Sequence, residues 1–147
     1  MKKIALIAGA SGALGSEILK NLCVSEHYSK VIALARHELE FTHEKLEVKI
    51  VNFDELKDEA PFIADELFCA LGTTMKAAKH KEQFYKVDVT YPINFAKFGL
   101  ECGAKRFVLL SAAGANRKSG SFYLKAKGQA EAKIKEIGYS SFHIARL

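Results

Sequence analysis

Short apolar segments alternate with segments of helical spacing along all 147 residues, and this alternation most constrains the fold. Each apolar segment is about five or six residues long, rich in β-branched residues and bounded by glycine or charged clusters, as is typical of buried parallel strands. The expected strands are residues 4–8, 30–35, 46–51, 66–70, 106–111 and 141–145. Strands and helices in alternation predict a parallel sheet with helices on both faces.

The segments between the strands differ in how clearly they indicate a helix. Apolar residues recur every fourth position in residues 14–22 and again in 123–137, which is the period of a helix with one buried face. Residues 91–100 are less regular, and residues 51–62 indicate only a short helix or an irregular crossover. With right-handed crossovers between roughly six strands, the sequence predicts an α/β fold: a single Rossmann-like, doubly wound domain over residues 1–147.

The composition is that of an ordinary folded domain, with 49% hydrophobic and 27% charged residues. This balance excludes a disordered chain, and no apolar run approaches the ~18 residues that span a membrane. The three cysteines lie far apart without metal-ligand spacing, so we expect buried free thiols and no metal site. The lysines after Met1 resemble the start of a signal peptide, but glycines soon interrupt the apolar run. We interpret the run as a buried strand and expect a cytoplasmic protein.

The net charge of +5 favours anionic ligands in general. Charge alone does not choose between nucleic acid and a phosphorylated cofactor. The basic residues are spread over the chain rather than collected in a tail, and no aromatic residues interleave the basic stretch at 76–81. Both features argue against a nucleic-acid partner.

Gly9, Gly12 and Gly15 form a GxxGxxG turn between the first expected strand and a helix expected over residues 16–23. Glycine at such a turn lets the chain reverse sharply, lets backbone approach a pyrophosphate, and lets the helix pack close to the strand. The helix N-terminus then offers free N–H groups to a phosphate. Glycines also mark plain turns, so the position between strand and amphipathic helix is what favours a dinucleotide site.

The second expected strand ends in Arg36, about twenty residues further on, at the place that discriminates between dinucleotides. An acidic residue there accepts a hydrogen bond from the ribose 2′-hydroxyl of NAD, whereas the planar guanidinium of Arg36 matches a 2′-phosphate. We therefore expect NADP(H) to be favoured over NAD(H). The alternative is a solvated arginine at the end of a strand.

Tyr123 and Lys127 form a Tyr-x-x-x-Lys pair at the start of the last expected helix. The spacing places both side chains on one face, and an ammonium near a phenol favours the phenolate, so Tyr123 could transfer a proton near neutral pH. Ser111 ends the fifth strand, at the edge where ligands bind in such sheets, and could hold a substrate carbonyl. Alone, the pair is an ordinary surface tyrosine and solvated lysine; its order after the glycine turn and Ser111 favours a catalytic set.

At these residues the chain resembles the short-chain dehydrogenase/reductase superfamily, in its atypical branch. The resemblance rests on residues 9–15, Ser111, Tyr123 and Lys127. Four longer segments resemble the Tat-interacting-protein-like group of NADPH-binding proteins: LGTT at 71–74, FxxVD at 84–88, FxLLS at 107–111 and FYLxxKGxxEAK at 122–133. The resemblance covers essentially the entire chain.

The resemblance implies how each matched position would hold a nicotinamide cofactor. Ser11, Gly12, Ala13 and Leu14 would line the pyrophosphate and adenosine side, and Arg36 would take the 2′-phosphate, with His37 where the group tends to have a second arginine. Asn52 and Phe53 would flank the adenine, Leu71 and Gly72 the ribose, Tyr123 and Lys127 the nicotinamide, and Arg146 would lie near the cofactor. Asp88 occupies a helix position often held by Asn or Asp in this group.

Together these features predict an NADP(H)-dependent oxidoreductase that moves a hydride between the nicotinamide and a carbonyl or alcohol carbon of a small-molecule substrate. The alternative is a non-catalytic NADPH-binding module that regulates association with a protein partner. Members of the resembled group continue past the strand that matches residues 141–146, so the substrate-binding portion is expected to lie outside this chain. A third alternative is a fragment that neither binds tightly nor catalyses. Homo-oligomerisation is left open.

Overall fold

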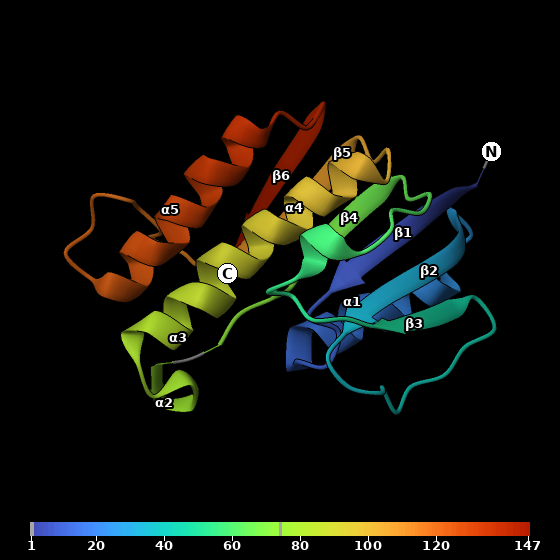
Figure 1. The fold of residues 1–147 in the computed structure, drawn as a ribbon, viewed down its shortest axis with the longest axis horizontal. Helices are drawn as coiled ribbons and strands as arrows, with labels where there is room; N and C mark the ends of the chain where they lie inside the picture. The colour runs from blue at the N-terminus through green and yellow to red at the C-terminus, as the bar shows by residue number, and fades with distance from the viewer. Residues whose placement is uncertain (1, 74) are drawn as a thin grey trace.

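A six-stranded parallel sheet forms the centre of the protein in a computed structural model. The structure describes residues 2–73 and 75–147, and of Met75 it describes the backbone alone. The order of the strands is β3-β2-β1-β4-β5-β6 (Figure 1). They are β1 (Lys3–Ala8), β2 (Tyr28–Ala35), β3 (Leu46–Ile50), β4 (Glu66–Cys69), β5 (Arg106–Ser111) and β6 (Ser141–Arg146). The chain winds outward in one direction to β3 and then in the other from β4, which confirms the doubly wound, Rossmann-like fold.

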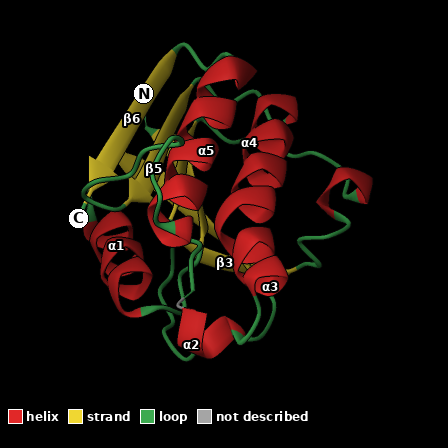
Figure 2. Cartoon of the chain, turned by 90° about the vertical axis from the view of Figure 1, so that its left-hand side faces the viewer, coloured by secondary structure: helices red, strands yellow, loops and turns green. Residues whose placement is uncertain are grey.

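Helices cover both faces of the sheet, as expected. On one face α1 (Ala13–Val24) packs against β1 and β2, whereas α4 (Tyr91–Glu101) and α5 (Phe122–Ile137) pack side by side on the other (Figure 2). The stretch between β3 and β4 contains a single 3₁₀ turn, η1 (Leu56–Asp58), where a short helix or an irregular crossover was expected. Gly138 ends α5 with φ +95°, a conformation that favours glycine. Within the two described stretches, no helix is both long and apolar enough to cross a membrane.

One helical segment contains a π-helical turn. After the short α2 (Met75–Ala78), α3 (Lys81–Tyr85) continues into the π-helical η2 (Lys86–Thr90), which leads directly into α4. Pro92 explains the turn, because it lacks the N–H that would bond to the carbonyl of residue 88, and its ring would clash with that carbonyl in a regular helix. The wider turn accommodates the proline.

Two layers of apolar side chains fill the space between the sheet and its helices. Leu6 of β1 packs with Phe95 of α4 and Ile134 of α5, whereas the next strand residue, Ile7, packs with Leu19 of α1 on the opposite face. Successive side chains of a strand point to opposite faces, so one strand contributes to both layers. Each large buried side chain contributes about 2 kcal/mol to folding. Together these side chains hold the helices on the sheet and so keep the carboxyl ends of the strands in place.

The two outermost strands are more exposed than the sequence predicts. Both were expected to be buried parallel strands, yet every residue of β3 is half-buried or exposed, and His143 and Ile144 of β6 are exposed. Each of these strands pairs with a neighbour on one side only. Apolar composition identifies a strand of a parallel sheet but does not reveal whether a second neighbour or a helix covers it, which is why the expectation of burial is wrong here.

Candidate functional site

The glycine turn joins β1 to α1 where the strands end, and two of its glycines are sterically required. Gly9 has φ +90°, and a Cβ on it would lie 2.5 Å from the carbonyl oxygen of Ala70. A Cβ on Gly15 would lie 2.8 Å from the carbonyl carbon of Gly9 and 3.2 Å from the Cα of Ala10. The turn therefore brings the end of β1, the start of α1 and the segment after β4 into backbone contact.

Gly12 differs from the other two glycines because the space around it is open. The nearest atom to a Cβ on Gly12 would be the carbonyl oxygen of Gly9, at 3.8 Å. Gly12 is the N-terminal cap of α1, and no side chain caps the helix there. The first N–H groups of a helix have no partner within the helix and attract anions. The exposed residues around this terminus, Ser11, Ala13 and Leu14, leave it accessible to a ligand.

A cleft of about 170 Å³ opens at the carboxyl ends of β1, β2 and β4. Among the residues matched to the cofactor, those that line it are Gly9, Ser11, Gly12, Arg36, His37, Phe53, Leu71 and Gly72. Those outside its lining are Ala13, Leu14, Gly15, Asn52, Tyr123, Lys127 and Arg146. The Arg36 side chain is exposed at the cleft, and it forms no hydrogen bond or ion pair with any residue that the structure describes.

One wall of the cleft is a pair of stacked aromatic rings, of which the sequence analysis found only Phe53. The rings of Phe53 and Tyr91 stack with centroids 5.7 Å apart, and both line the cleft. The Tyr91 hydroxyl donates to Oδ2 of Asp54 at 2.8 Å, and Nζ of Lys86 lies 2.9 Å from Oδ1 of the same carboxylate. The Lys86 hydrogen bond lowers the pKa of Asp54, whereas burial raises the pKa of Tyr91. The Asn52 side chain instead accepts the backbone N–H of Asp54 at 2.9 Å.

Lys127 lies beside the cleft at Gly72, where its ammonium forms an ion pair with Oδ1 of Asp88. The Asp88 side chain is fully buried, and its Oδ2 accepts the backbone N–H of Thr73 at 3.0 Å. A Cβ on Gly72 would lie 3.2 Å from Oδ1 of Asp88 and 3.4 Å from Nζ of Lys127. Burial raises the pKa of Asp88, and the charge of Lys127 offsets part of that rise. Thr74, the next residue of the matched segment, lies outside the described residues.

Tyr123 lies in the first turn of α5 with 37% of its surface exposed. Nζ of Lys127 lies over its ring, 5.6 Å from the centroid, and the ring of Phe84 packs against it at 5.4 Å. Its hydroxyl forms no hydrogen bond within the described part of the chain. The Tyr-x-x-x-Lys spacing thus brings the two side chains together on one face, but the ammonium faces the tyrosine ring while its charge is paired with Asp88.

Ser111 lies at the end of β5, where its buried hydroxyl donates to Oε2 of Glu131 at 2.7 Å. Arg146 of β6 binds the same carboxylate through Nη2, 2.6 Å from Oε1, and through Nε, 3.2 Å from Oε2. Ser111, Glu131 and Arg146 therefore form one network across β5, α5 and β6. Glu131 belongs to the matched segment at 122–133, but no role in the site was predicted for it. The available signal is its position four residues after Lys127, on the same face of the helix.

The structure thus gathers the predicted residues in two groups. We call the surroundings of Gly9, Gly12, Gly15 and Arg36, with the Phe53–Tyr91 wall, the glycine end of the site. We call the surroundings of Ser111, Tyr123 and Lys127 the tyrosine end. Gly72 connects the two, because it lines the cleft and also lies against the Lys127 ammonium.

Known proteins that resemble this chain include curated relatives of greater length. Protein HTATIP2 of Rattus norvegicus is 35% identical over 149 residues, which cover 98% of this chain and 61% of the relative. The mitochondrial protein FMP52 of Saccharomyces cerevisiae is 34% identical over 146 residues, which cover 96% of this chain and 63% of the relative. The chain thus spans less than two thirds of the length of either protein. The match to HTATIP2 confirms the resemblance to the Tat-interacting-protein-like group.

Solved structures share the fold. The enzyme WbmG of Bordetella bronchiseptica, crystallised in complex with NAD, has a TM-score of 0.78 and 17% sequence identity to this chain. The match covers 99% of this chain and 53% of that one. At this level of identity the likeness shows a common Rossmann-like fold.

The expectation of a cytoplasmic protein is wrong by the comparison with relatives. The matching FMP52 proteins of several fungi are named mitochondrial, and these names contradict the expectation. The expectation rested on interpreting the apolar N-terminal run as a strand rather than a signal peptide. The run is indeed β1, with Ala5, Leu6, Ile7 and Ala8 buried, but a buried strand carries no information about the compartment in which a protein works.

A family model matches most of the chain. The model of one family, described as the NAD dependent epimerase/dehydratase family, matches residues 5–125. This range contains the glycine turn and Arg36 of the glycine end, and Ser111 and Tyr123 of the tyrosine end. It also contains Asp88. The chain belongs to the NAD dependent epimerase/dehydratase family.

Proposed function

We propose that this chain binds NADP(H) in the cleft and acts as an oxidoreductase on a carbonyl or alcohol group of a small-molecule substrate. One observation carries the proposal: the cleft has at one side the Arg36 guanidinium, which forms no hydrogen bond or ion pair with a described residue, and at the other Gly72, against which the Lys127 ammonium lies. Family membership supports a nicotinamide dinucleotide. The preference for NADP(H) over NAD(H) rests on Arg36, because a guanidinium matches the geometry and charge of a 2′-phosphate.

The residues present fit such a cofactor. Gly9 and Gly15 allow close backbone contact that any Cβ would block, and the open, uncapped N-terminus of α1 at Gly12 suits a pyrophosphate. Phe53 and Tyr91 would contact the adenine, and Arg36 with His37 the 2′-phosphate. Ser11, Ala13 and Leu14 would border the pyrophosphate. Leu71 and Gly72 would border the ribose beside Lys127.

When bound, the nicotinamide ring supplies or accepts a hydride at a substrate carbon. Tyr123 would give the substrate oxygen a proton in reduction and take one in oxidation, since its hydroxyl is unbonded and its side chain partly exposed. Lys127 would donate to ribose hydroxyls, because an ammonium has three donors and Asp88 does not occupy all of them. Ser111 would orient the substrate oxygen after its hydroxyl leaves Glu131.

The test is a titration of the protein with NADPH and with NADH, followed by nicotinamide fluorescence, for wild type and Arg36→Ala. We expect NADPH affinity to fall roughly 10- to 100-fold in the variant, as for loss of a charge-assisted hydrogen bond, while weaker NADH binding stays unchanged. Arg117→Ala, at an exposed loop position, is the matched control and should bind like wild type. Absence of binding to either cofactor, or equal losses for both, contradicts the proposal.

A second candidate is a non-catalytic NADPH-binding module whose occupancy controls association with a protein partner. The observation that favours it is the engagement of the tyrosine end within the protein itself, where Glu131 holds Ser111 and Asp88 holds Lys127. Tyr123→Phe separates the candidates, because it spares the ring contacts and removes the hydroxyl. If the protein is an enzyme, NADPH consumption in a screen of carbonyl compounds is lost in this variant while cofactor affinity is kept. If the protein is a regulator, wild type and variant do not differ in NADPH consumption or in cofactor affinity.

A further inference from the structure

The lining of the cleft contains one arginine and one acidic residue. Among the described residues that line it, Arg36 and Glu38 are the only ones of the Lys, Arg, Asp or Glu type. They stand on either side of His37 in the sequence. One positive and one negative formal charge cancel, so the cleft is not the strongly cationic site that Arg36 alone would make it.

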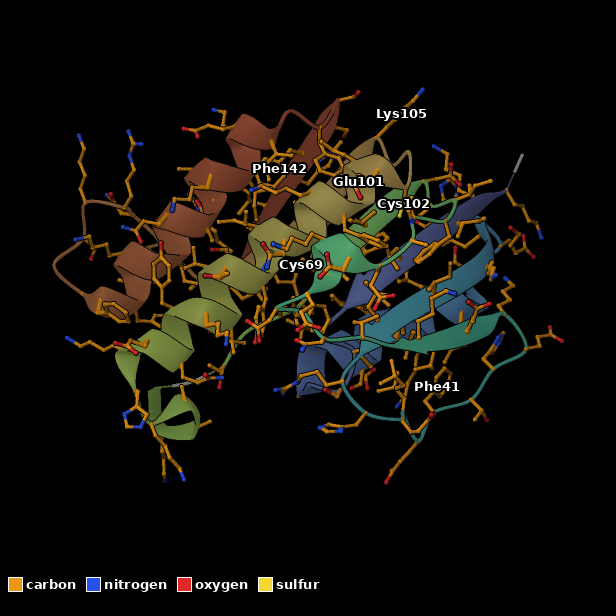
Figure 3. All side chains as sticks on the ribbon, viewed as in Figure 1. Phe41, Cys69, Glu101, Cys102, Lys105 and Phe142 are labelled. Carbon is orange, nitrogen blue, oxygen red and sulfur yellow. The ribbon has the colours of Figure 1, made fainter. Side chains whose placement is uncertain are left out.

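Glu38 is held at the cleft by the residues that follow it. Arg36, His37 and Glu38 come directly after the end of β2 at Ala35, and all three are exposed. Leu39, the next residue, is half-buried and packs against the apolar layer between α1 and the sheet. Phe41, labelled in Figure 3 on the loop that follows β2, packs against the same layer. The segment that contains Glu38 is therefore anchored beside the cleft.

Both charges are available to a ligand. The Glu38 carboxylate, like the Arg36 guanidinium, forms no hydrogen bond or ion pair with a described residue, and the two do not pair with each other. Burial raises the pKa of Tyr91, and the charge of Arg36 offsets part of that rise, so the guanidinium acts on the wall of the cleft. The carboxylate and the guanidinium thus act on the same space without neutralising each other by contact.

This arrangement treats the two nicotinamide cofactors differently. A phosphate monoester carries a charge of about −2 near neutral pH, so a 2′-phosphate beside Arg36 is attracted by the guanidinium and repelled by the Glu38 carboxylate. The 2′-hydroxyl of NAD(H) is uncharged and does not meet that repulsion. Because both side chains are exposed, solvent and salt weaken the effect without removing it.

We propose that Glu38 is a specificity-determining residue, which limits the preference for NADP(H) that Arg36 sets and so keeps NAD(H) usable as an alternative cofactor. This inference rests on the proposed function, since it takes a nicotinamide dinucleotide as the ligand of the cleft. It adds that the preference is a balance between two charges. A substitution at residue 38 therefore changes the choice of cofactor while every group that attracts the 2′-phosphate is kept.

The experiment measures the affinities for NADPH and NADH by nicotinamide fluorescence in wild type, Glu38→Gln and Glu38→Lys. We expect NADPH to bind about fivefold more tightly to Glu38→Gln and more tightly still to Glu38→Lys, because the residue changes from negative to neutral to positive. NADH affinity should stay within about twofold in both variants. A defect of folding would weaken both cofactors, so the ratio of the two affinities is the informative quantity.

Glu40→Gln is the matched control. Glu40 is also exposed and lies only two residues further along the chain, but it lines a neighbouring hollow of about 550 Å³ and is not among the residues that line the cleft. Glu40→Gln removes the same charge and should leave the ratio of NADPH to NADH affinity within about twofold of wild type.

Salt provides a second measurement on the same proteins. Between about 0.01 M and 1 M salt the screening length falls from about 30 Å to about 3 Å. The difference in NADPH affinity between wild type and Glu38→Gln should shrink over this range, since it arises from charge. A difference that salt leaves unchanged would contradict the repulsion.

The proposal is overturned if Glu38→Gln leaves the affinity ratio unchanged, if it changes both affinities equally, or if Glu40→Gln shifts the ratio as much. These outcomes leave the proposed function intact, provided that wild type binds NADPH and that Arg36→Ala weakens this binding. Failure of wild type to bind either cofactor would instead contradict the proposed function.

Discussion

The glycine end and the tyrosine end of the site differ in how their polar groups are satisfied within the protein. At the glycine end, the Arg36 guanidinium forms no hydrogen bond or ion pair with a described residue, and no side chain caps α1. At the tyrosine end, Lys127 is paired with Asp88 and Ser111 with Glu131. Unpartnered cationic donors suit phosphates, whereas balanced pairs suit hydroxyl and carbonyl groups. The glycine end and the tyrosine end therefore differ in whether their charged groups are paired within the protein.

The difference also concerns what each end contributes to folding. The glycine end depends on backbone-to-backbone contacts that require the absence of side chains at Gly9 and Gly15. The tyrosine end depends on buried side-chain interactions between helices and strands, namely the Lys127–Asp88 ion pair and the hydrogen bonds that Glu131 accepts from Ser111 and Arg146. Substitutions at the two ends should therefore act through different physical causes.

The largest effect is expected for Gly15→Ala at the glycine end. The new Cβ would lie 2.8 Å from the carbonyl carbon of Gly9, and neither backbone segment can move without separating α1 from β1. We expect the free energy of unfolding to fall by about 3 kcal/mol, measured by urea denaturation. Gly12→Ala, with open space around it, should cost no more than about 1 kcal/mol. Equal costs at the two positions would show that the tight packing is not what holds this end together.

The next largest effect is expected in the Ser111–Glu131–Arg146 network at the tyrosine end. Arg146→Ala leaves the Glu131 carboxylate buried with only Ser111 as a partner, whereas Glu131→Gln leaves a guanidinium that is 53% exposed and can be hydrated. We expect Arg146→Ala to lower the free energy of unfolding more than Glu131→Gln does, because only the first leaves a buried carboxylate without its cationic partner. Denaturation of both variants in one buffer measures the order. The reverse order would mean that the network does not depend on burial of the carboxylate.

A smaller effect is expected for Tyr91→Phe, which tests the wall of the cleft. The substitution keeps the stacking on Phe53 and removes only the hydrogen bond to Asp54, whose carboxylate retains Lys86. We expect a loss of about 1 kcal/mol or less in unfolding free energy and NADPH affinity within about threefold of wild type. Tyr91→Ala, which removes the ring, should weaken NADPH much more. If both variants bind alike, the aromatic wall does not contact the ligand.

The smallest effect is a difference in pH dependence between two aspartates. Asp54 has a lowered pKa, mainly through the Lys86 hydrogen bond, so its stabilisation is present above pH 3.8 and is lost as pH falls through the folded-state pKa. Asp88 has a raised pKa, mainly through burial, so stability falls as pH rises from 3.8 to its folded-state pKa and is constant above it.

Unfolding free energies measured between pH 3 and pH 7 check both signs. Asp54→Asn should differ from wild type by about 0.5 kcal/mol or less at neutral pH, since the group is largely exposed, with the difference shrinking in acid. Asp88→Asn should lack the decline of wild type above pH 3.8. If the contributions of Asp54 and Asp88 to the unfolding free energy changed with pH in the same direction, the expected contrast between the two ends would be wrong.

The fold could be predicted from the sequence because each strand carries a local signal. The apolar run over 106–111 coincides with β5, and the helical period over 123–137 corresponds to α5. What the pattern does not contain is how exposed the strands at the sheet edges are. The exposure of β3 and β6 depends on which segments pack over them, and that is a property of the assembled sheet.

The glycine end was predicted more completely than the tyrosine end, for a physical reason. Gly9 and Arg36 owe their roles to backbone conformation and to the end of a strand, both of which are local in sequence. Asp88 and Glu131 act through partners 39 and 20 residues away, Lys127 and Ser111 respectively. Because such pairs form only when distant segments pack together, the matched segments contain Asp88 and Glu131, but the pairing of Asp88 with Lys127 and of Glu131 with Ser111 was not predicted.

The π-helical turn before Pro92 sets the rotational phase between α3 and α4. Each residue of a regular helix advances the chain by about 100° around its axis, so deleting one residue from the Lys86–Thr90 turn would rotate everything before it relative to the core face of α4. Phe84, which packs against Tyr123, would then turn away from its present position relative to the core face of α4. A change of length in this turn, even one that preserves every named side chain, would therefore act on the tyrosine end as a rotation rather than as a loss of chemistry.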